Sequence, residues 1–494
     1  MGCQMNSASA VREDPQVAPR KTVLFGISMD GVLASGITEE FLKVASIFNG
    51  HGYRIYLDLG YDIRSDKGDF FRPYVNEADA LPDWLTLVRI QGLAAVRGYT
   101  QRLVTEMLEQ LRERDGERIR RCLDGSIVPR IAASIVDTWR RLDVSIVVVE
   151  NGSLPENLLF SEALRLAIEQ YGRERRKGPF VLWRDHDLMW FSESAKYGGP
   201  PFEGIPKPSV SKYIRYVTLT NTARKQLNQW APHVDATVLP NCFRFAEVAI
   251  DDGNRHFRSR YGIPADALLI ARCTRVIPQK RLDRDVFLLH ALQKSMRSSG
   301  GQRPVYLFVT GPTDEHEEER RRLSRMAIEL GVDDHVIYGN GLLPCSALCR
   351  PSNRASRETR YSVGDLLAHA DLSSFLTSYD YEGFGNPPAE ASAQKRPFIS
   401  STYEMYEEVY GEKGFKSLLL RTRKDWDGMP DHAYVQAVLE LLLDERRRER
   451  WARFNFELGR NHFSLEFLQR RLRACLPGAL ETAPSEAMHG AVSV

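Results

Sequence analysis

The sequence predicts an α/β protein built from two doubly wound parallel-sheet domains, and three observations support this. Short β-branched runs alternate with longer amphipathic segments, which is the pattern of βα units in parallel sheets. These runs form two series, separated by a stretch from Leu239 to Gly262 that has no strong periodicity. The chain has 494 residues, of which 43% are hydrophobic, and this is enough for more than one buried core.

Each series of runs predicts the strands of one sheet. The runs of the first series are residues 22–28, 53–59, 144–150, 179–185, 214–220 and 236–241. The runs of the second series are residues 267–274, 304–311, 335–341, 372–378, 396–401 and 416–420. Open parallel sheets bind ligands beyond the carboxyl ends of their strands, so we expect the functional residues in the loops that follow these runs.

Composition narrows the classes of partner. Lys and Arg number 67 against 65 Asp and Glu, and a net charge of +2 gives no global field that would attract nucleic acid or an anionic membrane. The N-terminus has no signal-peptide core, and the apolar runs elsewhere are too short to cross a bilayer. Seven scattered cysteines fit a reducing compartment. We therefore expect a cytoplasmic protein whose partners include neither nucleic acid nor a membrane.

The stretch YEGFGNPPAEASAQKRP, residues 381–397, is the most informative in the chain. It follows a predicted strand and should start a helix, with Asn386 as the N-cap and Pro387 at the first helical position. Gly383 and Gly385 allow the backbone to approach a ligand closely, and the N–H groups of the first helical turn attract an anion. The turn therefore suits a phosphate.

Two glutamates, Glu382 and Glu390, stand on either side of this predicted anion site. A carboxylate repels phosphate, but it accepts hydrogen bonds from hydroxyl groups. A sugar nucleotide has a diphosphate between two polyols and so matches this arrangement. The alternative is that Glu390 complements the helix dipole and Glu382 caps a turn.

A second set of candidate residues follows the run 267–274. Arg275 and Lys280 lie five positions apart after a strand end, where two cations neutralise one diphosphate. Gly311 and Gly341 belong to further tight turns at strand ends, and we interpret these turns as walls of the same site.

Taken together, these motifs resemble the retaining glycosyltransferases of family 4, which have the GT-B fold of two Rossmann-like domains facing a cleft. The resemblance covers roughly residues 21–476, and it is carried by EGFGNPPAEA, TRVIPQK, the linker VLPN and NFELGRNHFSLEFL. The stretches VENGSLPENL, RDHDLMWF, GFGN and YGEKGF are most similar to the branch that contains mannosylglucosylglycerate synthase.

The resemblance implies a role for each matching residue. Glu382 would contact the donor sugar, Glu390 the ribose, and Arg275 and Lys280 the diphosphate, while His186 would lie near the reacting carbon. The donor-binding residues are then expected to be Gly36, Arg275, Lys280, Gly311, Gly341, Glu382, Gly383, Phe384, Gly385, Asn386 and Glu390. The catalytic residues among these motifs are expected to be His186, Glu382, Arg275 and Lys280.

Two of these assignments keep an alternative. His186 also fits a hydrogen-bonded core histidine, because its position at a strand end is itself inferred. The family has paired glycines in its N-terminal loop, whereas GVLASGITEE has only Gly36 after Ser35, so the contact of this loop with phosphate stays open.

The first domain is expected to bind the acceptor at the ends of the runs 144–150 and 179–185. The candidates at or after the ends of these runs are Glu150, Asn151, Asn157, Asp187 and Trp190. A core position is the alternative for Trp190 and Phe191. The resemblance suggests a small polar acceptor such as glucosylglycerate, and Arg184 and Lys196 are near enough in sequence to meet a carboxylate.

The expected reaction needs neither a metal nor a cofactor other than the sugar nucleotide as co-substrate. Asp185 and Asp187, like Asp283 and Asp285, spell the DxD of metal-dependent transferases, but the two-sheet plan is the metal-free architecture. The resemblance implies a retained configuration, and with no second carboxylate placed under the sugar we expect same-face substitution rather than a covalent double displacement. A sugar-nucleotide epimerase and a non-catalytic sugar-nucleotide sensor are the rival functions.

The domain borders follow from the two series and from the resemblance. We expect a first domain at residues 21–243, a second at 244–455, and a helical segment at 456–478 that crosses back to the first domain. Residues 1–20 and 479–494 lack periodicity and are expected to be disordered tails.

Overall fold

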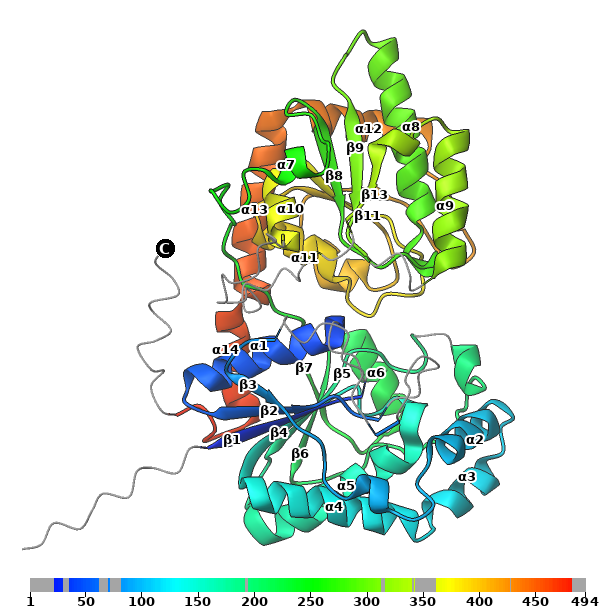
Figure 1. Cartoon of the computed structure of the whole chain (residues 1–494), viewed down its shortest axis with the longest axis vertical. Helices are drawn as coiled ribbons and strands as arrows, with labels where there is room; N and C mark the ends of the chain where they lie inside the picture. Colours follow the sequence, from blue (N-terminus) through cyan, green and yellow to red (C-terminus); the bar gives the residue numbers. More distant parts are fainter. Residues whose placement is uncertain are drawn as a thin grey trace, which may run out of the picture.

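The computed structural model describes residues 22–29, 35–61, 70–71, 81–191, 194–311, 316–339, 342, 361–426 and 428–481. Two α/β units lie one above the other, each built around its own sheet (Figure 1). All strand pairs within the two sheets are parallel. The predicted architecture of two doubly wound parallel sheets is confirmed.

The first sheet has the strand order β3-β2-β1-β4-β5-β6-β7. Its strands are β1 (Val23–Ser28), β2 (Arg54–Asp58), β3 (Leu85–Leu87), β4 (Val144–Glu150), β5 (Val181–Asp185), β6 (Ile214–Thr218) and β7 (Ala236–Val238). Six of them coincide with predicted runs. The strand β3 was not predicted, because three residues are too short to show a periodicity.

Helices cover both faces of the first sheet. They are α1 (Gly36–Gly50), α2 (Gln101–Arg112), α3 (Gly116–Leu123), α4 (Ile127–Leu142), α5 (Leu158–Arg175) and α6 (Asn221–Trp230). In Figure 1, α1 lies on the side of the sheet toward the second unit, and α4 and α5 lie on the opposite side. This arrangement explains why β1 is buried along its whole length, since a parallel strand covered on both faces has no solvated side.

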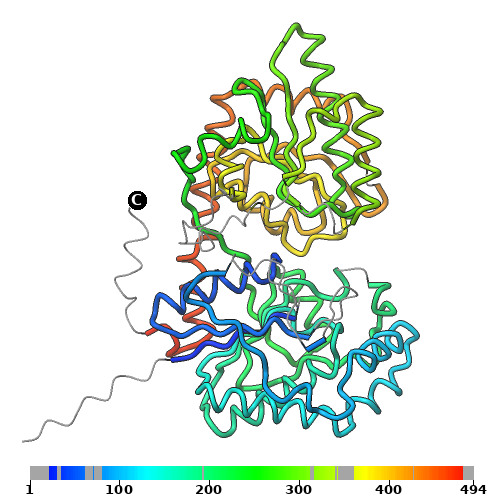
Figure 2. Tube along the Cα trace, in the orientation of Figure 1, coloured from blue at the N-terminus to red at the C-terminus, as the bar shows by residue number. Residues whose placement is uncertain are grey.

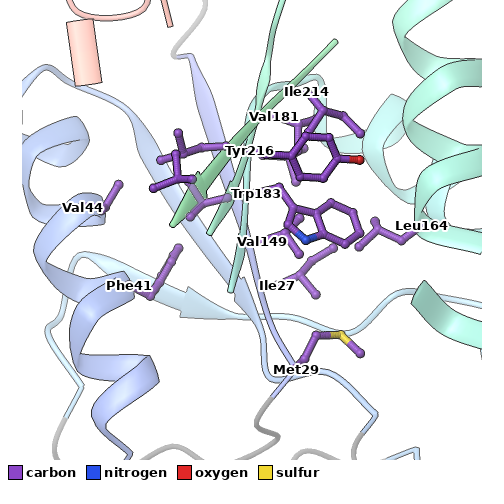
Figure 3. Close-up of a cluster of buried hydrophobic side chains, with 14 of the residues drawn as sticks. Ile27, Met29, Phe41, Val44, Val149, Leu164, Val181, Trp183, Ile214 and Tyr216 are labelled. Atoms are coloured by element: carbon purple, nitrogen blue, oxygen red, sulfur yellow. The ribbon is translucent and has the colours of Figure 1, made fainter. Parts of the chain in front are cut away.

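The core of the first unit fills the space on both sides of its sheet. Figure 3 shows Phe41 and Val44 of α1 on one side, and Trp183, Tyr216 and Leu164 on the other. Phe41 and Leu164 are fully buried, and burying such a side chain is worth about 1.5–3 kcal/mol. The ends of β4 and β5 are therefore held in a rigid frame.

The second sheet has the strand order β10-β9-β8-β11-β12-β13, and all six strands match predicted runs. They are β8 (Leu268–Arg272), β9 (Val305–Val309), β10 (Val336–Tyr338), β11 (Leu372–Phe375), β12 (Phe398–Ser401) and β13 (Ser417–Leu420). The helices of this unit are α7 (Phe257–Arg260), α8 (Leu282–Ser298), α9 (Glu317–Glu329), α10 (Val363–His369), α11 (Asn386–Ala393), α12 (His432–Leu443) and α13 (Glu445–Phe463).

The chain passes between the two units twice, and the two passages touch. The linker residue Phe243 pairs with Ser464, and its backbone N–H donates to the Phe463 carbonyl at 2.7 Å. Ser464 caps α14 (Leu465–Cys475), which packs on α1 of the first unit. In Figure 2 the green linker and the red C-terminal segment run side by side between the units. We call the contact of Phe243 with Phe463 and Ser464 the crossing.

The end of the described chain is packed, contrary to the expected tail from residue 479. Leu480 is buried, and Tyr53 donates its hydroxyl proton to the Ala479 carbonyl at 2.6 Å. These contacts hold residues 479 and 480 on the first unit. Residues 1–20, the other expected tail, lie outside the described residues. Within the described part of the chain, no helix is long and apolar enough to span a bilayer.

Candidate active site

The glycine-rich turn before α11 is held by two buried tyrosines. Tyr403 donates its hydroxyl proton to the Phe384 carbonyl, and Tyr410 donates to the Gly385 carbonyl, both at 2.6 Å. Gly385 has φ +83° and precedes the helix without a side-chain cap on the N–H groups of the first turn. Pro387 and Pro388 have no N–H group, so the backbone donors that this turn can offer to an anion are those of Gly385 and Asn386.

The predicted N-cap role of Asn386 is wrong, because the helix already includes this residue. The Asn386 amide instead bridges the two units. Its Nδ2 donates to Glu40 Oε1 at 3.2 Å, and its Oδ1 accepts from Asn241 Nδ2 at 2.9 Å. Asn386 thus ties α11 to α1 and to the linker, and its side chain is engaged there rather than at the helix start.

Phe384 anchors the turn and does not present its ring to a ligand. Only 3% of Phe384 is exposed, and its ring centroid lies 5.5 Å from Phe463 and 6.5 Å from Phe243. The ring therefore packs against both chain segments that meet at the crossing. In this placement, Phe384 can contact a donor only through its backbone.

Lys280, Glu382 and Arg275 come together at the carboxyl ends of β8 and β11. Lys280 Nζ lies 2.5 Å from Glu382 Oε1, and Thr377 donates its hydroxyl to the same oxygen at 2.9 Å. Burial lowers the pKa of Lys280, and the Glu382 carboxylate opposes this. The exposed Arg275 donates to the Tyr381 hydroxyl at 3.0 Å. Among the described residues, none donates to Glu382 Oε2, so this oxygen is free to accept from a sugar hydroxyl.

Two buried arginines support these turns, and sequence reasoning did not identify them. Arg272 donates to the carbonyls of Ser374 and Lys280, and its Nε lies 3.0 Å from Asp285 Oδ2. Arg284 donates to the Thr377 carbonyl at 2.6 Å. Both arginines lie next to recognised motifs, but burial of a charged side chain is not visible in the sequence.

The same contacts explain the triplet that begins at Asp283. Asp285 is buried against Arg272, and Asp283 pairs with Arg281 at 3.0 Å. These carboxylates are engaged by cations. In the first unit, both oxygens of Asp185 accept from Ser153, at 3.1 Å from its N–H and at 2.9 Å from its hydroxyl. Asp185, Asp283 and Asp285 of the two DxD triplets are thus used in structural contacts.

The remaining glycines have different surroundings. At Gly311, a Cβ would lie 2.3 Å from the Thr274 carbonyl oxygen, so the loop after β9 packs directly on the loop after β8. This contact fits the predicted wall. Gly36 is the first residue of α1, whose first turn is capped by the Ser35 hydroxyl. Gly341 lies outside the described residues.

Glu390 is half-buried in α11 and faces the acidic first turns of α1. Among the described residues, none donates a hydrogen bond to its carboxylate. Burial, followed by the nearby Glu39, raises the pKa of Glu390 to about 8, Glu40 adds to this, and Lys43 opposes it. A carboxylate in this position lacks donors, which the hydroxyl groups of a ribose would supply.

The raised pKa of Glu390 predicts how the stability of the fold depends on pH. A carboxyl group whose pKa is higher in the folded state binds more protons when folded, so stability falls as the pH rises from about 4.5 to about 8. We expect Glu390→Gln to match the parent chain near pH 5 and to exceed it by up to a few kcal/mol near pH 8. Chemical denaturation at both pH values measures this, with the exposed Glu457→Gln as the control. A stability difference that does not change with pH would contradict the assignment.

His186 lies directly after β5 and meets the glycine-rich turn of the second unit. A Cβ on Gly383 would come within 2.9 Å of the His186 carbonyl oxygen, so the two backbones touch. The His186 ring is buried, and its Nε2 lies 2.6 Å from Glu150 Oε2. Arg184 donates to the other oxygen of Glu150 at 2.7 Å. The structure therefore brings together His186, the turn, Lys280 and Glu382 along one interface.

Most of the predicted acceptor-binding residues have structural partners instead. Asn157 caps α5 and donates to the Tyr61 carbonyl and the Tyr99 hydroxyl, so its amide is fully used. Glu150 has both oxygens occupied. Asn151 accepts from the backbone N–H groups of His186 and Asp187, at 2.8 and 3.2 Å. These contacts engage the three side chains within the first unit, and their predicted contact with an acceptor stays a prediction.

Trp190 packs within the first unit, whereas Asp187 lies near the second unit. The Trp190 ring packs against Trp230 and Phe202, with ring centroids 5.9 and 6.3 Å away, which fits the alternative of a core position. Asp187 is half-buried, and its Oδ1 lies 3.8 Å from the position of a Cβ on Gly383. Asp187 is thus the predicted acceptor residue that lies closest to the second unit in these contacts.

Comparison with known proteins shows which sequences and structures this chain is similar to. No family model matches the chain. The mannosylglucosylglycerate synthase of Petrotoga mobilis is 22% identical over 364 residues, which cover 67% of this chain and 78% of that protein. A glycosyltransferase from Rickettsia africae has a similar structure, with a TM-score of 0.58, 13% identity and coverage of 94% and 100% of the two chains. The HepE protein of Anabaena, in complex with UDP and glucose, gives a TM-score of 0.56 at 12% identity and covers 92% and 98%.

Proposed function

We propose that this chain, a glycosyltransferase with the GT-B fold, moves a hexose from a nucleoside diphosphate sugar to a hydroxyl group of a small polar acceptor. The proposal further assigns it to family 4, with retained configuration at the anomeric carbon and without a required metal. The relatives support this donor class, since the similar HepE structure holds UDP and glucose.

One observation carries the proposal. Lys280, Glu382 and the uncapped N-terminus of α11 share one strand-end site, and Gly383 of that site touches the His186 carbonyl of the other unit. A diphosphate fits the cations and the backbone N–H groups of Gly385 and Asn386, and a sugar fits Glu382 Oε2 beside it. The transferred group would then lie where both units reach it.

The charges of this site suit bond cleavage at the sugar. Breaking the bond from C1 to the phosphate builds negative charge on the leaving diphosphate, which Lys280, Arg275 and the backbone N–H groups of Gly385 and Asn386 stabilise. Glu382 is held by Lys280 and Thr377 and does not act as a free nucleophile. We therefore assign same-face substitution, in which the leaving phosphate oxygen takes the proton of the acceptor hydroxyl.

A turnover assay with a panel of donors tests the function. The purified chain is incubated with UDP- and GDP-linked glucose and mannose, with and without glucosylglycerate and other small glycosides, and products are separated by chromatography. We expect a glycoside product only when donor and acceptor are both present. Release of the nucleoside diphosphate or a changed sugar without an acceptor indicates the epimerase, and tight binding without turnover indicates the sensor.

Asp187 is expected to act on the acceptor. We predict that Asp187→Ala raises the acceptor KM at least several-fold and leaves the donor Kd within about twofold, because Asp187 lies in the first unit beside Gly383. Steady-state kinetics with varied acceptor measure this. The exposed Asp235→Ala, in the same unit, serves as the control. An unchanged acceptor KM, or transfer to membrane lipid alone, would remove the small-acceptor assignment.

Metal removal gives a further prediction. Because Asp185, Asp283 and Asp285 are engaged by Ser153, Arg281 and Arg272, we expect full activity in EDTA. Initial rates are measured after dialysis against EDTA and again after addition of Mn²⁺ or Mg²⁺. Activity that disappears and returns with Mn²⁺ would point to Asp187 as a metal ligand.

A further inference from the structure

The His186 ring uses one nitrogen and leaves the other unused. Nε2 lies 2.6 Å from Glu150 Oε2, while Nδ1 is buried without a hydrogen-bond partner among the described residues. Only 4% of the His186 side chain is exposed. An ionised carboxylate has no proton to donate, so the short contact requires the proton on Nε2. In the neutral ring Nδ1 is then a hydrogen-bond acceptor.

Glu150 is held in its ionised form. It is completely buried, and burial raises its pKa, but Arg184 and then His186 outweigh burial and bring the pKa below its ordinary value. Arg184 is only 1% exposed and stands opposite Glu150 in the register of β4 and β5. A buried charge of this kind is stable only with its partner in place.

The pair is also fixed to the second unit. Arg184 Nη1 donates to the Glu40 carbonyl at 3.3 Å, and the Glu40 side chain accepts from Asn386 at the start of α11. The backbone of His186 is fixed by Asn151 Oδ1 at 2.8 Å. The ring orientation is therefore determined from β4, β5 and α1 together.

We propose that Glu150 and Arg184 are positioning residues that hold the His186 imidazole with its proton on Nε2, so that Nδ1 accepts a hydrogen bond from a hydroxyl group of the transferred sugar. This inference rests on the proposed function for the identity of the ligand. A buried acceptor without a partner is costly, and a sugar hydroxyl that reaches Nδ1 removes that cost. A nucleoside diphosphate without a sugar cannot do so. The backbone carbonyl of His186 lies at the contact with Gly383 of the glycine-rich turn.

The proton position is tested by ¹⁵N NMR of the chain labelled at histidine, with His186→Ala to assign the signal. We expect the Nε2–H tautomer in the parent chain and its loss or mixture with the other tautomer in Glu150→Gln, whose side-chain amide can also donate. Glu174→Gln, which removes a surface partner of Arg140, is the matched control and should leave the His186 signal unchanged. An Nδ1–H tautomer in the parent chain would overturn the inference.

Binding and kinetics test the consequence. In Glu150→Gln we expect kcat to fall on the order of 10–100-fold and the affinity for the productive sugar nucleotide to fall, while the Kd of the free nucleoside diphosphate stays within about twofold. The double variant of Glu150→Gln with His186→Ala should be no slower than His186→Ala alone, because Glu150 acts on turnover only through the His186 ring. Additive losses, or an equal loss for the nucleoside diphosphate, would contradict the proposal.

Two outcomes separate this inference from the proposed function. If no donor is turned over by the parent chain, the proposed function fails, and the NMR result still decides how Glu150 sets the ring. If Glu150→Gln does not fold, Glu150→Asp keeps the charge but shortens its reach, and we expect the same loss of kcat with an intact circular dichroism spectrum. Full activity of a folded Glu150→Asp with a changed tautomer would contradict the role of Nδ1.

Discussion

Lys280→Ala is expected to lower turnover on the order of 10²-fold, the loss seen when one preorganised charge stabiliser is removed. Lys280 lies 2.5 Å from Glu382 at the strand-end site, and its side chain is 12% exposed. Its charge acts in a poorly solvated place, where electrostatic stabilisation is stronger than in water. Steady-state and single-turnover rates with the productive donor measure the effect.

The loss should appear mainly in kcat, because negative charge on the leaving diphosphate grows in the transition state. Arg275→Ala is expected to show the same direction, and the exposed Lys294→Ala on α8 should retain full turnover. Thermal unfolding checks that each variant is folded. Unchanged turnover in both Lys280→Ala and Arg275→Ala would show that the diphosphate binds elsewhere.

Gly385→Ala is expected to lower the free energy of unfolding by roughly 2–5 kcal/mol. Gly385 has φ +83°, where a side chain costs about 1–2 kcal/mol. A Cβ there would also lie 2.3 Å from the Tyr403 hydroxyl and 2.9 Å from the Phe375 ring, and such overpacking costs about 1–3 kcal/mol. Because Tyr403 holds the turn, the affinity for a nucleoside diphosphate should fall as well.

The matched control is Gly414→Ala. Gly414 has φ +86°, but no atom of the described residues lies within 4 Å of the position that a Cβ would take, so only the backbone strain remains. We expect a loss of about 1–2 kcal/mol from this change. Equal losses from the two substitutions would show that the contact with Tyr403 contributes nothing to the turn.

The strands and motifs of this chain were predictable, because strand burial and turn chemistry are local properties of a sequence. EGFGNPPAEA and TRVIPQK each lie at a strand end, and topology brings strand ends of one sheet together. Side-chain partners across the fold were not predictable. Glu150 ends a strand and Asn157 follows it, as ligand residues would, yet their hydrogen bonds go to Arg184 and to Tyr99.

The start of α11 shows the same limit within a single motif. An Asn before two prolines has the local chemistry of an N-cap, and the sequence alone favours that role for Asn386. In the structure, the Asn386 amide instead forms hydrogen bonds with Glu40 and Asn241, which are far away in the chain. A local rule fails here because a contact between two domains competes for the same side chain.

The packing of Phe384 joins the ligand turn to the point where the chain changes domains. Its ring lies against Phe243 and Phe463, so a rotation of one domain about the crossing must displace the ring or carry the turn with it. A ligand that orders the turn then favours one angle between the domains, and the same angle raises the affinity for that ligand by an equal factor. We therefore expect a substitution at Phe243 to change both the donor affinity and the angle between the domains.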